Sequence, residues 1–359
     1  MTPFLPRTLL GACALAAATL ILPAAAGTPS RSDCGVDDPQ LSISGCTLVI
    51  DDRRTDANKR VNARGMRGIA RHKSGDLTGA RADFTAVLAA WPQDHGTLTL
   101  RGNVNADLGH YDEAIADYSA ALAIDPQNVN ALMARALAYD HGHDYDRAIT
   151  DLSLAVILAP GDPTPVAARA LAFVQKNDFV HAREDLDAAI RLDPKDATYY
   201  VSRGDLRGRT GDHDGAIADA TAAIELAPDD LRAYFNRAKA YQARARGSVA
   251  DDLNKALADY DVVMRLKPDN DFLAWVLGRR GLVHHELGEF DAAITDFTLL
   301  LGVDSTATRA NVERARAYAA KGDFAHAVAD YDVALKQWPT SAKLLAWRAE
   351  AAAKLAQAP

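Results

Sequence analysis

The sequence has little cysteine, no excess of basic residues and no long apolar run after its N-terminal segment. It contains 3 cysteines among 359 residues, and 40 lysines and arginines against 48 aspartates and glutamates give a formal net charge of -8. A nucleic-acid-binding protein needs surplus positive charge to displace counterions from phosphates, so this balance argues against that function. Because a membrane helix needs about 20 apolar residues, we expect no transmembrane segment in the mature chain.

Sequence motifs of nucleotide binding and hydrolysis are also absent. The chain has no P-loop, no G-x-G-x-x-G after a strand, no G-x-S-x-G and no H-E-x-x-H motif. His141 and His143 lie beside Asp140 and Asp144, and such a cluster could hold a metal, but exposed turns often have this composition without one. We therefore predict no catalytic residues, no cofactor and no metal site.

The N-terminal residues have the features of a secretory signal peptide. Arg7 precedes an uninterrupted run of apolar or small residues from Thr8 to Leu22, which is too short for a membrane span. Small residues that end at Ala26 fit a signal-peptidase site, so we assign 1–26 as a signal peptide and predict an exported protein.

The three cysteines fall into two groups. Cys13 ends the segment Leu10-Gly11-Ala12-Cys13, which resembles a lipobox, and a lipid on Cys13 is the alternative that would anchor the protein to a membrane. Cys34 and Cys46 remain after cleavage at Ala26, and in an exported protein such a pair indicates a disulfide. The C-x-x-C spacing of many redox and metal sites is absent, so we predict a structural disulfide within an N-terminal extension, 27–60.

A period of 34 residues runs through the rest of the chain. The segments YDEAIADYSAALAIDP, YDRAITDLSLAVILAP, FVHAREDLDAAIRLDP and HDGAIADATAAIELAP each end on a proline, and successive prolines lie 34 residues apart. Six extra residues interrupt the period once, near 244–249. Each repeat has two amphipathic stretches, so we predict two helices in every repeat.

This pattern resembles the tetratricopeptide repeat (TPR), a helical hairpin of 34 residues. The resemblance rests on alanine at repeat position 20, an aromatic or apolar residue at 24 and glycine or alanine at 8; in the second unit these are Ala114, Tyr118 and Gly102. It implies an all-α fold, a right-handed α-solenoid of about eight hairpins with a C-terminal capping helix in 342–359. The eight units are 61–94, 95–128, 129–162, 163–196, 197–230, 231–270, 274–307 and 308–341.

Two positions depart from the family pattern. Position 24 of the fifth unit is only Ala220, and position 11, which is usually aromatic, is polar in four units. We expect looser packing at these places. The four polar residues at position 11 are Arg71, Asn105, Arg207 and His284.

The turn between the two helices of a unit has its own pattern. Position 15 holds glycine, asparagine or histidine in seven units, which is typical of a left-handed helix cap. An aspartate or glutamate commonly follows and can cap the second helix. The predicted cap residues are Gly75, Gly109, His143, Asn177, Gly211, Gly288 and Gly322.

Every unit has an arginine at position 7 and an aspartate at position 23. Position 7 in the family usually holds an apolar residue that faces the interior, so the arginine should be partly buried and needs a partner. We favour ion pairs between the two helices of each unit over the alternative, a basic stripe that binds an anion. The predicted pairs include Arg101 with Asp117, Arg135 with Asp151, Arg169 with Asp185, Arg203 with Asp219 and Arg237 with Asp259.

By resemblance to other TPR proteins, repeat positions 2, 5, 9 and 12 line a groove formed by the first helices. An apolar centre with charged ends suits an extended or helical segment of a partner protein. No unit has lysine at position 5, so we expect no clamp for a chaperone tail. The predicted groove residues are Asn103, Met133, Leu137, Leu171, Val174, Asp205, Phe235, Lys239, Leu282 and Arg316.

These observations predict a scaffold or adaptor of the cell envelope, a monomer that binds an unidentified protein or peptide in its groove. The resemblance to exported bacterial TPR proteins with a cysteine-bearing N-terminal extension implies the periplasm. One alternative is a structural component that self-associates through its end caps, with Leu344, Leu345, Trp347 and Leu355 on an outer face of the last helix. Another is a metal-dependent hydrolase, for which the sequence offers no set of site residues.

Overall fold

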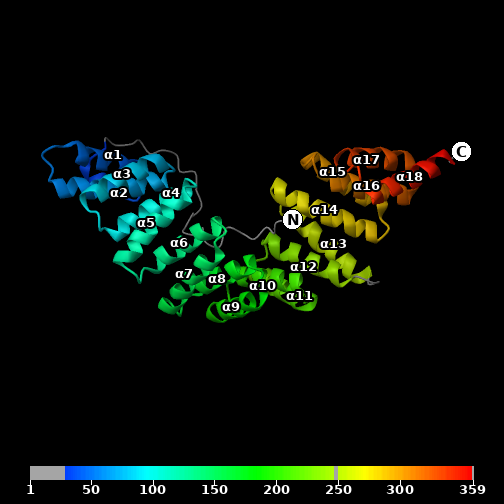
Figure 1. The fold of residues 1–359 in the computed structure, drawn as a ribbon, viewed down its shortest axis with the longest axis horizontal. Coiled ribbons are helices and arrows are strands. Elements are labelled where there is room, and N and C mark those ends of the chain that lie inside the picture. The colour runs from blue at the N-terminus through cyan, green and yellow to red at the C-terminus, as the bar shows by residue number, and fades with distance from the viewer. Residues whose placement is uncertain (1–28, 246–249, 358–359) are drawn as a thin grey trace. The chain divides into compact units, whose positions relative to one another are not determined.

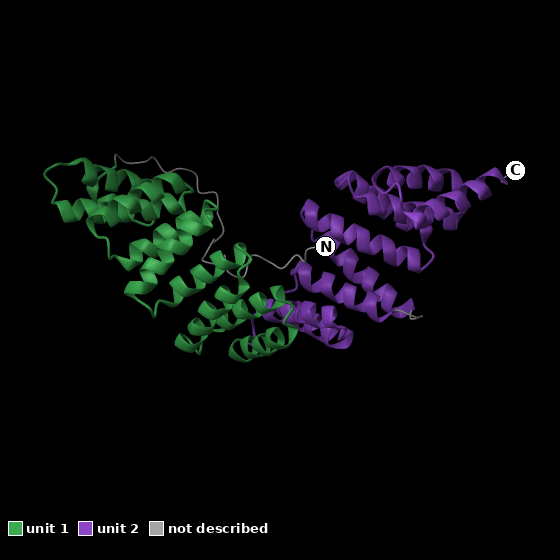
Figure 2. Ribbon diagram, in the orientation of Figure 1, with its two compact units in different colours: residues 1–193 green, residues 194–359 purple. Residues whose placement is uncertain are grey.

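The computed structural model describes residues 29–245 and 250–357, and every regular element within them is a helix (Figure 1). The predicted signal peptide, 1–26, and the lipidation site Cys13 lie outside the described residues, as do residues 246–249 of the insertion. In the described part of the chain no helix has the length and apolar character of a membrane span. The chain divides into two compact units, Met1–Asp193 and Pro194–Pro359 (Figure 2).

The first unit contains a short 3-10 turn and nine helices within the described residues. From α2 onward the helices form hairpins, and each hairpin packs against the next. Its elements are η1 (Arg31–Asp33), α1 (Pro39–Asp51), α2 (Ala57–Lys73), α3 (Leu77–Ala90), α4 (His95–Asp107), α5 (Tyr111–Ile124), α6 (Val129–His141), α7 (Tyr145–Leu158), α8 (Pro163–Gln175) and α9 (Phe179–Leu192).

The second unit repeats the same arrangement and ends on a single helix, α18, that packs on α17. First helices of neighbouring hairpins contact one another, α10 with α12, α12 with α14 and α14 with α16. The predicted α-solenoid is therefore confirmed. The elements are α10 (Ala197–Thr210), α11 (His213–Leu226), α12 (Leu231–Arg244), α13 (Ala250–Arg265), α14 (Asn270–Glu286), α15 (Phe290–Val303), α16 (Thr308–Lys321), α17 (Phe324–Gln337) and α18 (Ala342–Ala356).

The N-terminal extension folds onto the first hairpin. Cys34 and Cys46 form a disulfide, as predicted, and Cys46 is buried against Ile50 and Ala63. The loop before α1 lies so close to Gly45 that an added Cβ would stand 2.6 Å from the backbone nitrogen of Cys34. The helix α1 takes the place of a second helix before α2, and Cys46 lies where later units have their aromatic residue.

The turns inside the hairpins follow the predicted pattern. All seven residues predicted as left-handed caps have positive φ, and His143 and Asn177 do so at φ 60° without being glycine. The aspartate that follows accepts a backbone hydrogen bond at the start of the next helix, as Asp178 does from the N–H of His181. Glu289 does not do this, because its longer side chain instead reaches His284 Nδ1 at 2.7 Å.

The first helix of the seventh unit begins ahead of residue 274, where the repeat pattern starts. Asp269 accepts a hydrogen bond from the backbone N–H of Phe272, and this cap starts α14 at Asn270. An N-cap aspartate satisfies one of the free N–H groups at a helix start, which fixes the boundary.

The fifth unit is not loosely packed, contrary to the expectation from Ala220. An added Cβ on Gly204 would stand 3.3 Å from Asp219 Cβ and 3.4 Å from the carbonyl oxygen of Ala216. In the second unit the same test on Gly102 meets the ring of Tyr118 instead. Because both facing residues are small, the backbone of α11 itself occupies the space that a ring fills elsewhere.

Candidate functional site

All eight units contain the same ion pair between their two helices. Each arginine at position 7 donates from Nε and Nη2 to both carboxylate oxygens of the aspartate at position 23, at 2.6 to 2.9 Å. The aspartates are buried, and the hydrogen bonds that Arg169 donates to Asp185 raise the pKa of Arg169 above its usual value. The structure thus places together Arg101 with Asp117, Arg135 with Asp151, Arg169 with Asp185, Arg203 with Asp219 and Arg237 with Asp259.

A third contact of these arginines, which sequence reasoning missed, joins neighbouring hairpins. Nη1 of Arg135 donates to Ser119 Oγ at 3.0 Å, and Nη1 of Arg169 donates to Ser153 Oγ at 3.2 Å. In both cases the acceptor is at repeat position 25 of the preceding unit. Thr85, Thr221, Asp261 and Thr298 accept in the same way, so the recurring serine, threonine or aspartate at that position was the available signal.

Three of the four polar residues at position 11 also contact the buried aspartate of their own unit. Asn105 Nδ2 donates to Asp117 Oδ2 at 3.0 Å, and Arg71 Nη1 donates to Asp83 Oδ2 at 2.8 Å. Arg207 Nη1 lies 3.0 Å from Asp219 Oδ2. The arginines at position 7 donate from three nitrogens to protein groups, as Arg135 does. They therefore stabilise contacts between helices and do not form a free anion site.

The predicted groove residues of the first unit lie on the first helices α4, α6 and α8. Met133, Leu137 and Leu171 are half-buried, and Asn103 accepts a 2.8 Å hydrogen bond from the Tyr118 hydroxyl. Val174 is only 4% exposed and cannot contact a partner. The reason is that α8 is rich in buried alanine, which lets its neighbours approach until they cover Val174.

Three predicted groove residues of the second unit, Asp205, Phe235 and Lys239, contact one another. Lys239 Nζ lies 3.0 Å from Asp205 Oδ1 and 5.5 Å from the centre of the Phe235 ring. Phe235 itself is 8% exposed and belongs to the core, where its ring packs on Tyr260 and Phe272. Phe235 is therefore a core residue, and its prediction as a groove residue is wrong.

The remaining two predicted groove residues differ in their surroundings. Leu282 is half-buried and packs against Phe297 and Ala317. Arg316 lines an open pocket of about 250 Å³ at the C-terminal end of the second unit, which we call the α18 pocket. It is bounded by α14, α16, α17 and α18, and its lining residues are His285, Arg316, Ala319, Ala320, Phe324, Tyr331, Trp347, Glu350, Ala351 and Lys354.

Cations lie over the aromatic rings of the α18 pocket. Arg316 Cζ is 5.3 Å and Lys343 Nζ 4.6 Å from the centre of the Trp347 ring. Arg316 Nη1 also donates to Glu313 Oε2 at 2.6 Å. Burial, with a smaller contribution from Arg316, lowers the pKa of His285 below its usual value, so that His285 is neutral at pH 7.

Other features that the sequence singled out do not form a site. His141 stacks on Tyr111, and His143 Nδ1 lies 2.8 Å from the Tyr145 hydroxyl. Across the described ranges no three histidine, cysteine, aspartate or glutamate side chains converge on a possible metal position. On α18, Leu345 and Leu355 are exposed, but Leu344 is buried and Trp347 packs on Tyr331, so the predicted apolar outer face has two members rather than four.

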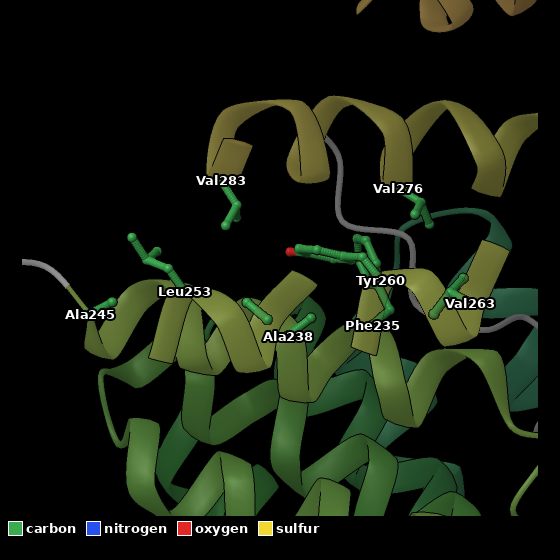
Figure 3. Close-up of a cluster of buried hydrophobic side chains, with 9 residues drawn as sticks. Phe235, Ala238, Ala245, Leu253, Tyr260, Val263, Val276 and Val283 are labelled. Atoms are coloured by element: carbon green, nitrogen blue, oxygen red, sulfur yellow. The ribbon is translucent and has the colours of Figure 1, made fainter. Parts of the chain in front are cut away.

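Two buried tyrosines at position 24 differ in one hydrogen bond. The Tyr118 hydroxyl donates to Asn103 at repeat position 9, whereas the Tyr260 hydroxyl has no partner within the described residues. Position 9 of that unit is Lys239, which is a donor and cannot accept. Figure 3 shows the Tyr260 oxygen pointing toward the apolar side chains of Leu253 and Val283.

This difference predicts opposite effects of the same substitution. Tyr118→Phe removes a hydrogen bond and should lower the free energy of unfolding by about 1 kcal/mol. Tyr260→Phe removes a buried donor that has no acceptor, so it should leave stability unchanged or raise it by about 1 kcal/mol. Urea unfolding of both variants tests this, and a comparable loss in both would show that the Tyr260 hydroxyl is satisfied in solution.

Comparison with known proteins decides the family. The model described as "Tetratricopeptide repeat" matches residues 99–163, 167–230, 201–271 and 279–342, which together span more than half of the chain. The chain belongs to the tetratricopeptide repeat family. Proteins of this fold generally serve as scaffolds for protein–protein interaction.

Solved structures show the same fold. A TPR protein from Parabacteroides merdae is 20% identical with a TM-score of 0.56, over 71% of this chain and 97% of that one. The APC/C hetero-tetramer Cut9–Hcn1 contains a chain that is 14% identical with a TM-score of 0.55, over 82% of this chain and 56% of that one. None of the proteins with curated descriptions matches this TPR chain in sequence.

Proposed function

We propose that this TPR protein is a scaffold or adaptor of the bacterial cell envelope that binds a partner protein on the face formed by its first helices. The observation that carries the proposal is the set of apolar side chains on α6 and α8, namely Met133, Leu137 and Leu171, that the packed hairpins leave half-buried. Apolar groups that a repeat array does not cover are the usual anchors for a partner chain.

The location in the periplasm has separate support. The signal-peptide pattern in 1–26 predicts export, and the Cys34–Cys46 disulfide fits an oxidising compartment. We further propose that the protein is a monomer, because the exposed apolar surface of α18 is limited to Leu345 and Leu355.

The test is capture of partners from envelope extract with two matched double variants. Leu137→Asp with Leu171→Asp places charges on the first helices, and Leu154→Asp with Val180→Asp places them at exposed positions of the second helices α7 and α9. We expect the first double variant to lose a specific partner band and the second to keep it. Circular dichroism of both variants checks that each remains folded.

The opposite pattern would contradict the proposal. If the band survives the changes on α6 and α8 but is lost with those on α7 and α9, the second helices form the binding face.

A further inference from the structure

We propose that the α18 pocket binds a peptide segment of a partner protein in which a large apolar side chain is flanked by carboxylates. This inference rests on the proposed function and specifies the chemistry of the partner. It arises from the size of the pocket, from the Tyr331 hydroxyl, which has no acceptor among the described residues, and from the local charge.

The shape of the pocket suits one side chain. Ala319, Ala320 and Ala351 are small and leave the space open, while Trp347 and Phe324 provide aromatic surface beside it. A volume of about 250 Å³ is below the roughly 300–1,000 Å³ of sites that enclose whole small molecules. The pocket therefore fits an anchoring side chain of a larger partner, with the Trp347 indole as one wall.

The hydroxyl of one pocket-lining residue, Tyr331, has no acceptor within the described protein. Tyr331 is 2% exposed, and among the residues that the structure describes its hydroxyl has no hydrogen-bond partner. In the second unit the equivalent Tyr118 donates to Asn103 at repeat position 9. Position 9 of the eighth unit is Arg316, which is a donor and cannot accept from the hydroxyl as Asn103 does.

The protonation state of the hydroxyl supports this geometry. Burial raises the pKa of Tyr331 to about 12, so the group is a hydrogen-bond donor at neutral pH. The hydroxyl is open to the pocket, so an acceptor on a ligand can replace the water that it otherwise binds.

The charge around the pocket favours an acidic ligand. Arg316 is paired with Glu313 and Lys354 with Glu350, at 2.6 and 2.8 Å, whereas Lys343 has no carboxylate partner in the described ranges. The pocket rim therefore has a surplus positive charge in a chain whose net charge is -8. Carboxylates beside the anchoring side chain would bind Arg316 and Lys343 at the rim and accept from Tyr331.

The experiment is selection of a random heptapeptide library, displayed on phage, against the purified mature protein. We expect enriched peptides to combine an aromatic or large aliphatic residue with aspartate or glutamate nearby. Anisotropy of one labelled, enriched peptide then measures affinity for variants. Trp347→Ala and Arg316→Glu should each weaken binding about tenfold or more, and Tyr331→Phe should weaken it about threefold.

Trp338→Ala is the matched control, because Trp338 is exposed and lies outside the pocket lining. It should change affinity less than twofold, and circular dichroism checks the fold of every variant. Selection repeated on the Arg316→Glu protein should shift enrichment toward lysine and arginine.

Three results would overturn the inference: no enriched peptides, enriched peptides without acidic residues, or affinity that is indifferent to both Trp347→Ala and Arg316→Glu. Peptides that bind indifferently to these changes but lose affinity with Leu137→Asp and Leu171→Asp would overturn only the assignment to the α18 pocket. The proposed function would then stand.

Discussion

Replacing Arg169 with alanine is expected to lower the free energy of unfolding by about 3 kcal/mol or more. The substitution leaves the buried Asp185 carboxylate without its two donated hydrogen bonds and leaves Ser153 of the preceding hairpin without its partner. Because each TPR hairpin contacts only its neighbours, the loss should also reduce the cooperativity of unfolding. Urea and thermal unfolding followed by circular dichroism measure both effects.

Arg183→Ala on the neighbouring α9 is the control, since Arg183 is exposed. It should change stability by less than about 0.5 kcal/mol. The double variant Arg169→Leu with Asp185→Ala should lose less stability than Arg169→Ala does. In the double variant no buried carboxylate remains unpaired, and leucine supplies apolar contacts. Unchanged melting of Arg169→Ala would show that the ion pair contributes nothing to the fold.

Phe297→Ala is expected to destabilise the protein by about 3–5 kcal/mol, as a truncated, fully buried aromatic residue leaves a cavity. Phe297 fills the space between its own hairpin and the next one, where it packs on Ala293 and Ala317. The space cannot collapse easily, because Gly281 already lies so close that an added Cβ would stand 2.9 Å from the Phe297 ring.

Leu299→Ala on the same helix separates this cavity effect from a loss of helix stability. Leu299 is exposed, so its truncation should cost less than about 0.5 kcal/mol. Equal losses for the two variants in urea unfolding would contradict the assignment of Phe297 to the interface between hairpins.

The fold could be predicted because its determinants recur in every unit. A single Arg135 or Asp151 is ambiguous, but the two residues recur at fixed positions, and a buried charge requires an opposite one. The αL turns at His143 and Asn177 were predictable for the same reason, as glycine holds the position in the other units that have this turn. The contact from Arg135 to Ser119 escaped prediction, since it depends on how one hairpin docks on the next.

The candidate site was harder to predict because exposure depends on helix separation. Val174 and Phe235 lie at repeat positions that face the groove in other TPR proteins, yet here they are covered by neighbouring helices. The α18 pocket combines Arg316 with Trp347 from the capping helix, which no repeat position relates to each other. The packing of α18 against the last hairpin, α16 and α17, brings these two residues together.

The most direct test of partner binding on the first helices is photo-crosslinking in the native envelope. Benzoylphenylalanine in place of Asn130, exposed at repeat position 2 on α6, should yield a partner crosslink, whereas the same group in place of Leu154, exposed on α7 of the same hairpin, should yield none. A crosslink from position 154 with none from position 130 would contradict the account, because the second helices would then hold the partner.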